Sequence, residues 1–280
     1  MFYSVIDTLN VANTVKSAGS SDSGWILHHV MDSHTLDFEP FFTIQLPHLE
    51  LFGIDISITK YIFFMWVVAI ILFIILYTAS RKYKTSLIPK GLANVIEITV
   101  LFVRDEIVKP TIGKGYERFL PYLLTVFFFI LLSNFFGLIP YAVTITGNIA
   151  VTAALAGISF IAIQFGGIRN HGMWGYFKGL IPSGMPPWIL IIIIPLEILG
   201  LFTKPFALCI RLFANMIAGH VVILSLIGLI FILQTAFVAP VSIAFAIFIY
   251  LLELLVALIQ AYIFTILTSL FIGMAVHQEH

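Results

Sequence analysis

The sequence predicts an all-α polytopic membrane protein, and three observations support this class. Of the 280 residues, 60% are hydrophobic and only 10% are charged, whereas soluble proteins average about 25% charged residues. The mean hydropathy is +1.08. Several apolar runs reach or approach the roughly 20 residues that span about 30 Å of hydrocarbon. We expect one N-terminal transmembrane helix, an amphipathic surface helix, a transmembrane hairpin, and two long, strongly tilted helices that form a C-terminal hairpin.

The acidic segment 1–59 precedes the first apolar run and contains seven acids but one base, Lys16. Its first 20 residues lack a cationic start and a clean apolar core, so we expect no secretory signal in them. Its histidines fit no standard zinc template, so we expect them to be solvated and to bind no metal. They are His28, His29, His34 and His48.

The segment 60–80 is the first transmembrane helix, because Tyr61 to Ala79 is uninterrupted apolar sequence. Three bases follow at once: Arg81, Lys82 and Lys84. Positive charge marks the cytoplasmic side, so the N-terminal segment lies outside. The basic segment 81–118 then contains an amphipathic helix from Pro89 to Lys109, whose apolar residues follow helical spacing while charges interrupt any spanning run.

The segment 119–166 is a transmembrane hairpin, with arms Phe119 to Tyr141 and Ile149 to Gly166 and an uncharged turn between them. We interpret Asn134, within the first arm, as an interhelical hydrogen-bonding group rather than a transport site. A second cytoplasmic loop, 167–187, follows and is rich in glycine and proline.

The segment 188–280 contains two apolar runs, Trp188 to Leu233 and Val238 to Val276, each about twice as long as a span needs. Each is either two spans with a tight turn or one tilted helix. Because no charged or turn-forming cluster lies midway, we favour two tilted helices, the first bent at Pro195 and Pro205. The C-terminus then lies in the cytoplasm.

The charged side chains within these two runs are few: Glu197, Lys204, Arg211 and Glu253. A charge such as that of Arg211 costs about 2.5 to 17 kcal/mol at the bilayer centre, depending on the method, so it needs a functional explanation. Snorkelling explains it poorly, since Arg211 lies many turns from either end of its run.

Helical spacing separates two faces. Residues seven apart drift only about 20°, so Glu197, Lys204 and Arg211 share one face, with Asn215 near it. His220 is nine residues from Arg211 and points the opposite way. Glu197 and Lys204 are equally consistent with an ion pair or interface anchors and with an aqueous path.

Glu253 and Gln260 share one face of the second run. An antiparallel hairpin would bring Gln260 to the depth of Arg211 and Glu253 to the depth of His220, although spacing alone does not show contact. His220 alone is typical of a neutral core histidine, but beside a buried acid it is a candidate proton relay. The amides Asn215 and Gln260 are equally consistent with helix packing.

No short motif for nucleotide, metal or thiol chemistry occurs. The sequence has no GxxxxGK[ST], HExxH or CxxC pattern, and its single cysteine, Cys209, excludes an internal disulfide. We therefore expect no cofactor, no metal and no nucleic-acid partner. Any ATP chemistry would belong to another subunit.

The run RLFANMIAGH, from Arg211 to His220, follows TKP, and LIQAYIF, from Leu258 to Phe264, lies in the last run. These motifs closely resemble subunit a of F-type ATP synthases, and the likeness extends from the first transmembrane helix to the C-terminus. The resemblance implies a proton-conducting stator subunit in an energy-coupling membrane, such as a bacterial inner membrane. The implied partners are a ring of c subunits, the b-subunit peripheral stalk and, through the whole complex, the F1 head.

The resemblance also implies roles for individual residues. Arg211 would face the ring carboxylate, with Asn215 and Gln260 close to it. The half-channels would be lined by Glu197, His220 and Glu253, and Lys204 is a further candidate on the Arg211 face. Some bacterial members carry histidine and glutamate at positions 220 and 253 in the reverse order, which supports the two working as a couple.

Two rival functions remain open from the residues alone. A self-contained secondary transporter would use Arg211 to bind an anionic substrate, but the chain shows no internal repeat and no paired glycine-broken helices. A structural membrane scaffold would leave the intramembrane Arg211, His220 and Glu253 unexplained.

Overall fold

The computed structural model describes residues 35–38, 42–45, 50–51, 54–55, 57, 59–85, 91–139, 142–179, 186–233 and 237–277. The prediction of solvated N-terminal histidines falls outside this part of the chain. Two short antiparallel hairpins precede the helices, and the sequence did not indicate them. Strand β1 (Thr35–Phe38) pairs with β2 (Phe42–Gln45), and β3 (Glu50–Leu51) pairs with β4 (Ile54–Asp55).

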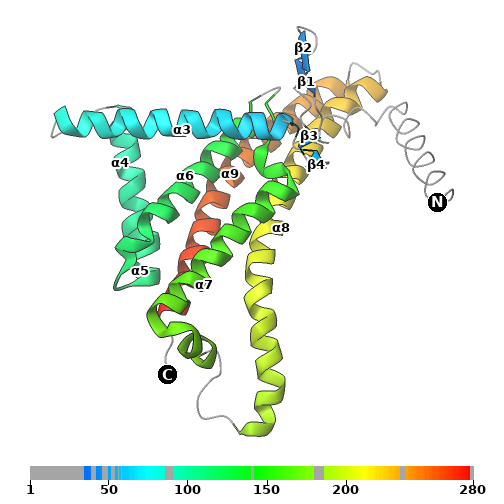
Figure 1. Ribbon diagram of the computed structural model, residues 1–280. Coiled ribbons are helices and arrows are strands. Elements are labelled where there is room, and N and C mark those ends of the chain that lie inside the picture. Colours follow the sequence, from blue (N-terminus) through cyan, green and yellow to red (C-terminus); the bar gives the residue numbers. More distant parts are fainter. Residues whose placement is uncertain are drawn as a thin grey trace.

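Five helices are long and apolar enough to cross a membrane, which confirms the predicted all-α polytopic class. They are α3 (Lys60–Thr85), α6 (Leu120–Gly137), α7 (Ile149–Gly179), α8 (Pro187–Leu233) and α9 (Val238–Val276). Figure 1 shows α3 lying crosswise to the other four, across one end of α6.

The predicted amphipathic segment is helical from Leu92 to Ile112, as α4 (Leu92–Phe102), the π-helical turn η1 (Val103–Val108) and α5 (Lys109–Ile112). Only its second half packs firmly on the chain: the side chains of η1 and α5 that point inward are fully buried, whereas those of α4 are mostly exposed. A π-helical turn inserts a residue and so rotates the apolar face. Figure 1 shows α4 below α3, running crosswise to it toward α5.

The connection between α6 and α7 contains the 3₁₀ turn η3 (Ile145–Gly147). Beyond it, α7 continues past Gly166 into the region predicted to be a loop. The backbone of Gly172 has φ 71°, which suits glycine and folds the end of α7 back on itself. This return places the ring of Tyr176 so close to Gly167 that a Cβ there would collide with it. Burial of Tyr176 explains why a glycine-rich stretch is ordered as helix.

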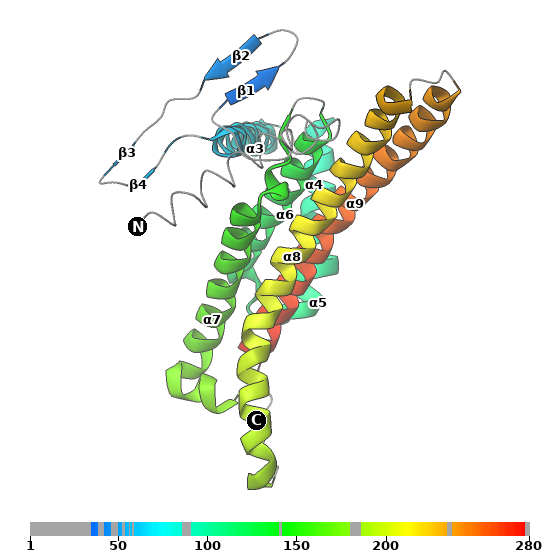
Figure 2. The ribbon, with the colours of Figure 1, turned by 90° about the vertical axis from the view of Figure 1, so that its right-hand side faces the viewer.

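Each long C-terminal run is one continuous helix, of 47 residues for α8 and 39 for α9, and neither is two spans with a tight turn. Pro195 and Pro205 lie inside α8 without ending it. Figure 2 shows α8 and α9 side by side and antiparallel over much of their length. The main core lies where α9 meets α6, α7, α8 and η1, and includes Leu212, Phe264 and Ile272. The tilt of the two helices in a membrane stays a prediction.

Candidate functional site

The middle of α8 has one packed face and one open face. Leu208, Leu212 and Met216 are almost fully buried, whereas Arg211 is exposed. Within the described part of the chain, no acid forms an ion pair with Arg211. The open face around Arg211 also presents three small exposed residues, at positions Ala207, Ala214 and Ala218. A guanidinium in an apolar helix is therefore directed away from its own chain, over a surface that another helix can approach closely.

Asn215 and Gln260 meet across the α8–α9 interface. The Asn215 side chain donates from Nδ2 to Oε1 of Gln260 over 3.0 Å. Gln260 is 2% exposed, while Asn215 lies on the open face one turn beyond Arg211. The buried Gln260 amide thus fixes the position of the exposed Asn215 amide. Spacing placed Gln260 at the depth of Arg211, and the structure shows it bound to Asn215, one turn further along α8.

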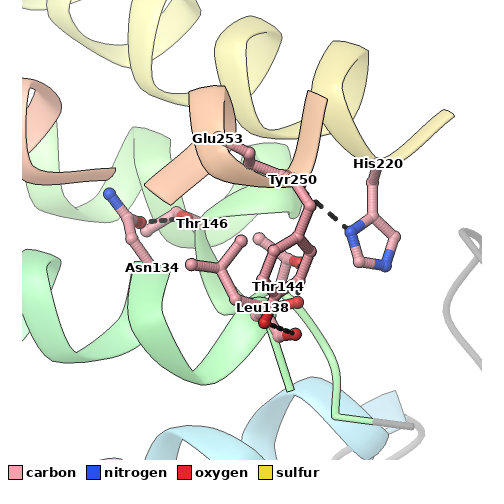
Figure 3. Close-up of polar contacts among 8 residues, drawn as sticks. Asn134, Leu138, Thr144, Thr146, His220, Tyr250 and Glu253 are labelled. Carbon is pink, nitrogen blue, oxygen red and sulfur yellow. Dashed lines mark hydrogen bonds and ion pairs between the residues drawn. The ribbon is translucent and has the colours of Figure 1, made fainter. Parts of the chain in front are cut away.

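His220 and Glu253 also meet, on the other side of α8. His220 Nδ1 lies 3.9 Å from Glu253 Oε1 (Figure 3). The Glu253 side chain is 3% exposed and His220 is 31% exposed. Neither carboxyl oxygen of Glu253, nor Nδ1 of His220, has a hydrogen-bond partner within the described structure. Unpaired buried polar atoms are costly and are normally satisfied by water or by a proton, so this site suits proton exchange.

Glycine at position 219 makes the approach of Glu253 possible. A Cβ on Gly219 would lie 2.9 Å from Glu253 Oε1 and 3.0 Å from its Cδ. Such distances are shorter than real Cβ contacts, so any side chain at position 219 would displace the carboxyl. The glutamate therefore rests against the backbone of α8, directly beside His220.

A buried polar cluster lies next to this pair, on α6 and η3. Thr146 donates from Oγ1 to Asn134 Oδ1 over 2.6 Å, and Asn134 Nδ2 donates to the carbonyl of Ala257 over 3.4 Å. Asn134 and Thr146 are fully buried. Asn134 joins helices, as the sequence indicated. Figure 3 shows this cluster on one side of Glu253 and Tyr250 on another.

Tyr250 was not among the predicted site residues. It lies on α9, one turn before Glu253. Its hydroxyl donates to the carbonyl of Leu138 over 3.0 Å (Figure 3). A bond to a main-chain carbonyl has no sequence signature. Tyrosine three residues before an intramembrane acid was the one available signal, because such spacing puts both on the same side of a helix.

Glu197 and Lys204 lie apart from both pairs and do not bind each other. The Lys204 ammonium lies 5.2 Å from the centre of the Phe271 ring, and Lys204 is half-buried. Glu197 is half-exposed. The ion pairs among the described residues do not include Glu197 or Lys204, and their interpretation as interface anchors or as part of an aqueous path stays a prediction.

The geometry thus shows one open cationic face and one enclosed acid–histidine pair on the same helix. A family model described as ATP synthase A chain matches residues 62–273. The chain belongs to this family. It is 54% identical over 258 residues to "ATP synthase subunit a" of Chloroherpeton thalassium, which covers 91% of this chain and 77% of the relative.

Two further relatives agree. "ATP synthase subunit a 2" of Chlorobaculum tepidum is 54% identical over 255 residues, covering 89% of this chain and 72% of the relative. "ATP synthase subunit a" of Myxococcus xanthus is 51% identical over 238 residues, covering 84% of this chain and 78% of the relative. Membership in the ATP synthase A chain family makes this chain an integral membrane subunit of an F-type ATP synthase, active in ATP synthesis and ion transport within that complex. Membership also excludes the self-contained transporter.

Proposed function

We propose that the chain conducts protons as the stator subunit of a rotary ATP synthase, with Arg211 forcing each arriving ring carboxyl to release its proton. The observation that supports this most directly is the position of Arg211. It is an exposed cation, without an ion-pair partner among the described residues, in the middle of a 47-residue apolar helix and on a face lined by small residues. A charge held there at such cost needs a mobile counter-charge from outside the chain.

Electrostatics supports this role for Arg211. A carboxyl facing lipid is neutral, because burial disfavours its charged form. At about 4 Å from a guanidinium and an effective dielectric of about 20, its ionised form gains about 4 kcal/mol. That energy favours proton release by a factor of roughly 10³. The ionised carboxyl can leave only after it has been reprotonated, and the fixed positive charge blocks a direct leak of protons past Arg211.

The proton enters and leaves on different sides of Arg211. We assign the pair of His220 and the buried Glu253 to the half-channel that opens outside, and Glu197 to the half-channel that opens to the cytoplasm. This agrees with an outside N-terminus and a cytoplasmic C-terminus in a bacterial inner membrane. Asn215, held by Gln260, keeps the polar surface next to Arg211 in place. Lys204, directed at Phe271, has the weakest support as a channel residue.

The proposed partners follow from the same surfaces. The open face of α8 would contact the c-subunit ring. Helices α3 and α4 expose large apolar side chains, such as Trp66, Phe73 and Leu92, that suit lipid and the membrane helix of the b-subunit peripheral stalk. The F1 head would be reached only through the assembled complex.

Arg211→Ala tests the proposal in inverted membrane vesicles that contain the whole complex. Proton-driven ATP synthesis should fall below detection, because release from the ring loses a factor of roughly 10³. Ile210→Ala is the matched control, since Ile210 is the exposed neighbour of Arg211 on the same helix. Synthesis at the normal rate in the Arg211→Ala complex would refute the proposal.

A further inference from the structure

We propose that Tyr250 is a positioning residue that fastens the α6–α7 connection, described at residues 138–139 and 142–148, to α9 and so restricts the approach of outside solvent to the Glu253 carboxyl. The inference rests on the proposed function only in assigning Glu253 to the outer half-channel. The fastening itself is a matter of geometry. It concerns a hydroxyl group that the proton path does not otherwise use.

The contact joins two elements far apart in sequence. Helix α6 ends at Gly137, and the last carbonyls of a helix have no partner within it. The carbonyl of Leu138, the next residue, is satisfied instead by the Tyr250 hydroxyl of α9 at 3.0 Å. One side-chain hydrogen bond therefore holds the start of the connection to α9.

The rest of the connection that the structure describes, residues 142–148, contacts α6, α7 and α8 more than α9. Thr144 packs so tightly on Gly137 that a Cβ there would collide with its hydroxyl, and Thr146 donates to Asn134. Among the side-chain hydrogen bonds of the described residues, the bond from Tyr250 alone joins the connection to α9. Removal of the Tyr250 hydroxyl should therefore loosen the connection from α9 but leave it attached to α6.

Glu253 lies between two such fastenings on α9. Three residues before it, Tyr250 binds Leu138, and four residues after it, the carbonyl of Ala257 accepts from Asn134 (Figure 3). Both neighbouring turns of α9 are thus hydrogen-bonded to α6 or to its end, whereas the Glu253 oxygens have no hydrogen-bond partner among the described residues. The two ties hold α6 and α9 at a separation that leaves the carboxyl enclosed but free to exchange a proton.

A thiol reporter measures this enclosure directly. In vesicles with the assembled complex, a cysteine is introduced by Glu253→Cys, and its labelling by a small water-soluble methanethiosulfonate added from the outer side is timed. The same complex without the reporter gives the background from Cys209, which is buried. Adding Tyr250→Phe should speed labelling about two- to tenfold, the equilibrium shift that one ordinary hydrogen bond sustains.

Tyr262→Phe is the matched control. Tyr262 is also on α9 and similarly exposed, but its ring contacts Phe102 and its hydroxyl has no hydrogen-bond partner within the described structure. Labelling should keep its original rate in this variant. Equal labelling rates in the Tyr250→Phe and Tyr262→Phe complexes would overturn the inference.

A second measurement avoids the reporter. In the Tyr250→Phe complex with Glu253 intact, hydrogen exchange at the amide of Ala142 should become faster, because that amide donates to Ile139 within the loosened connection. Unchanged exchange there would also overturn the inference. Failure of the proposed function looks different: normal proton flux in Glu253→Gln would remove Glu253 from the path while leaving the labelling result intact.

Discussion

The two faces of α8 differ in how their charged groups are placed: one exposes its charge and the other encloses a carboxyl. Arg211 is exposed on the open face of α8 and forms no ion pair with the residues that the structure describes. Glu253 is 3% exposed against the opposite face, with His220 3.9 Å away. A permanent cation needs no local partner if it acts on a group that arrives from outside. A group that must gain and lose a proton needs a neighbour to exchange with and shelter that keeps its proton from leaking. Under the proposed function, one face acts on the ring carboxyl and the other passes protons to it.

Glu253→Gln should give the largest effect on the enclosed face. The amide keeps the size of the side chain but cannot carry a proton, so proton flux driven by ATP hydrolysis should fall by at least about tenfold. The amount of assembled complex should change little, because no described hydrogen bond to Glu253 is lost. Acridine-dye quenching in vesicles measures the flux. A normal flux would show that Glu253, and with it the enclosed face, does not conduct protons.

Exchanging the two groups should restore part of that loss. His220→Glu combined with Glu253→His keeps one acid and one imidazole at the same site, so the double variant should conduct better than either single variant. A double-mutant cycle on the initial quenching rate measures the coupling. Additive losses would show that the two residues act separately.

Cysteine cross-linking should then map the open face. Cysteines introduced by Ala207→Cys and Ala214→Cys flank Arg211 on that face. They should cross-link to cysteines in a small helical ring subunit under mild oxidation, as should Asn215→Cys. The buried Met216→Cys is the control and should not react. Cross-linking at position 216 in place of the exposed positions would reverse the assignment of the two faces.

Gln260→Leu should have a moderate effect, because it acts on Arg211 only through Asn215. Loss of the 3.0 Å hydrogen bond frees the exposed amide, and one such bond corresponds to roughly fivefold in rate. Asn215→Leu should cost a similar factor, and the double variant little more. Rates of ATP synthesis in vesicles decide this. Strictly multiplicative losses would place the two amides in separate roles.

The smallest effect should come from a charge pair outside the membrane-spanning helices. Arg104 binds Asp105 through two hydrogen bonds of 2.9 and 2.8 Å, which lower the pKa of the Asp105 carboxyl and raise that of Arg104. The contribution of a lowered carboxyl pKa is fully present above the ordinary value of about 3.9 and is lost as the pH falls through the lower value. Asp105→Asn should therefore shift the thermal denaturation of the complex slightly and equally at pH 6 and pH 8. A shift that differed between the two pH values would contradict this.

The open face around Arg211 was predictable from sequence, whereas the contacts that enclose Glu253 were not. Arg211 stands out because a charge within an apolar run is rare, and helical spacing alone separates its face from that of His220. Folding the two runs back on each other placed Gln260 at the depth of Arg211, but its hydrogen bond with Asn215 was not predicted. Hydrophobic runs also predicted the spanning helices closely.

Main-chain contacts and local backbone shape explain what was missed. Tyr250 binds a carbonyl, and every residue has one, so no pattern of side chains points to the contact. The extension of α7 depends on Gly172 turning the chain back and on Tyr176 finding room over Gly167. In sequence, the same glycines indicate a loop.

The space that a side chain at position 219 would need, between α8 and α9, is occupied by the Glu253 side chain. Since a Cβ at position 219 would lie 2.9 Å from the Glu253 carboxyl, the volumes of the two side chains are linked. A relative with alanine or serine at position 219 should carry a shorter residue, such as aspartate, at position 253. The two positions should therefore vary together across the family, even though neither side chain forms a bond with the other.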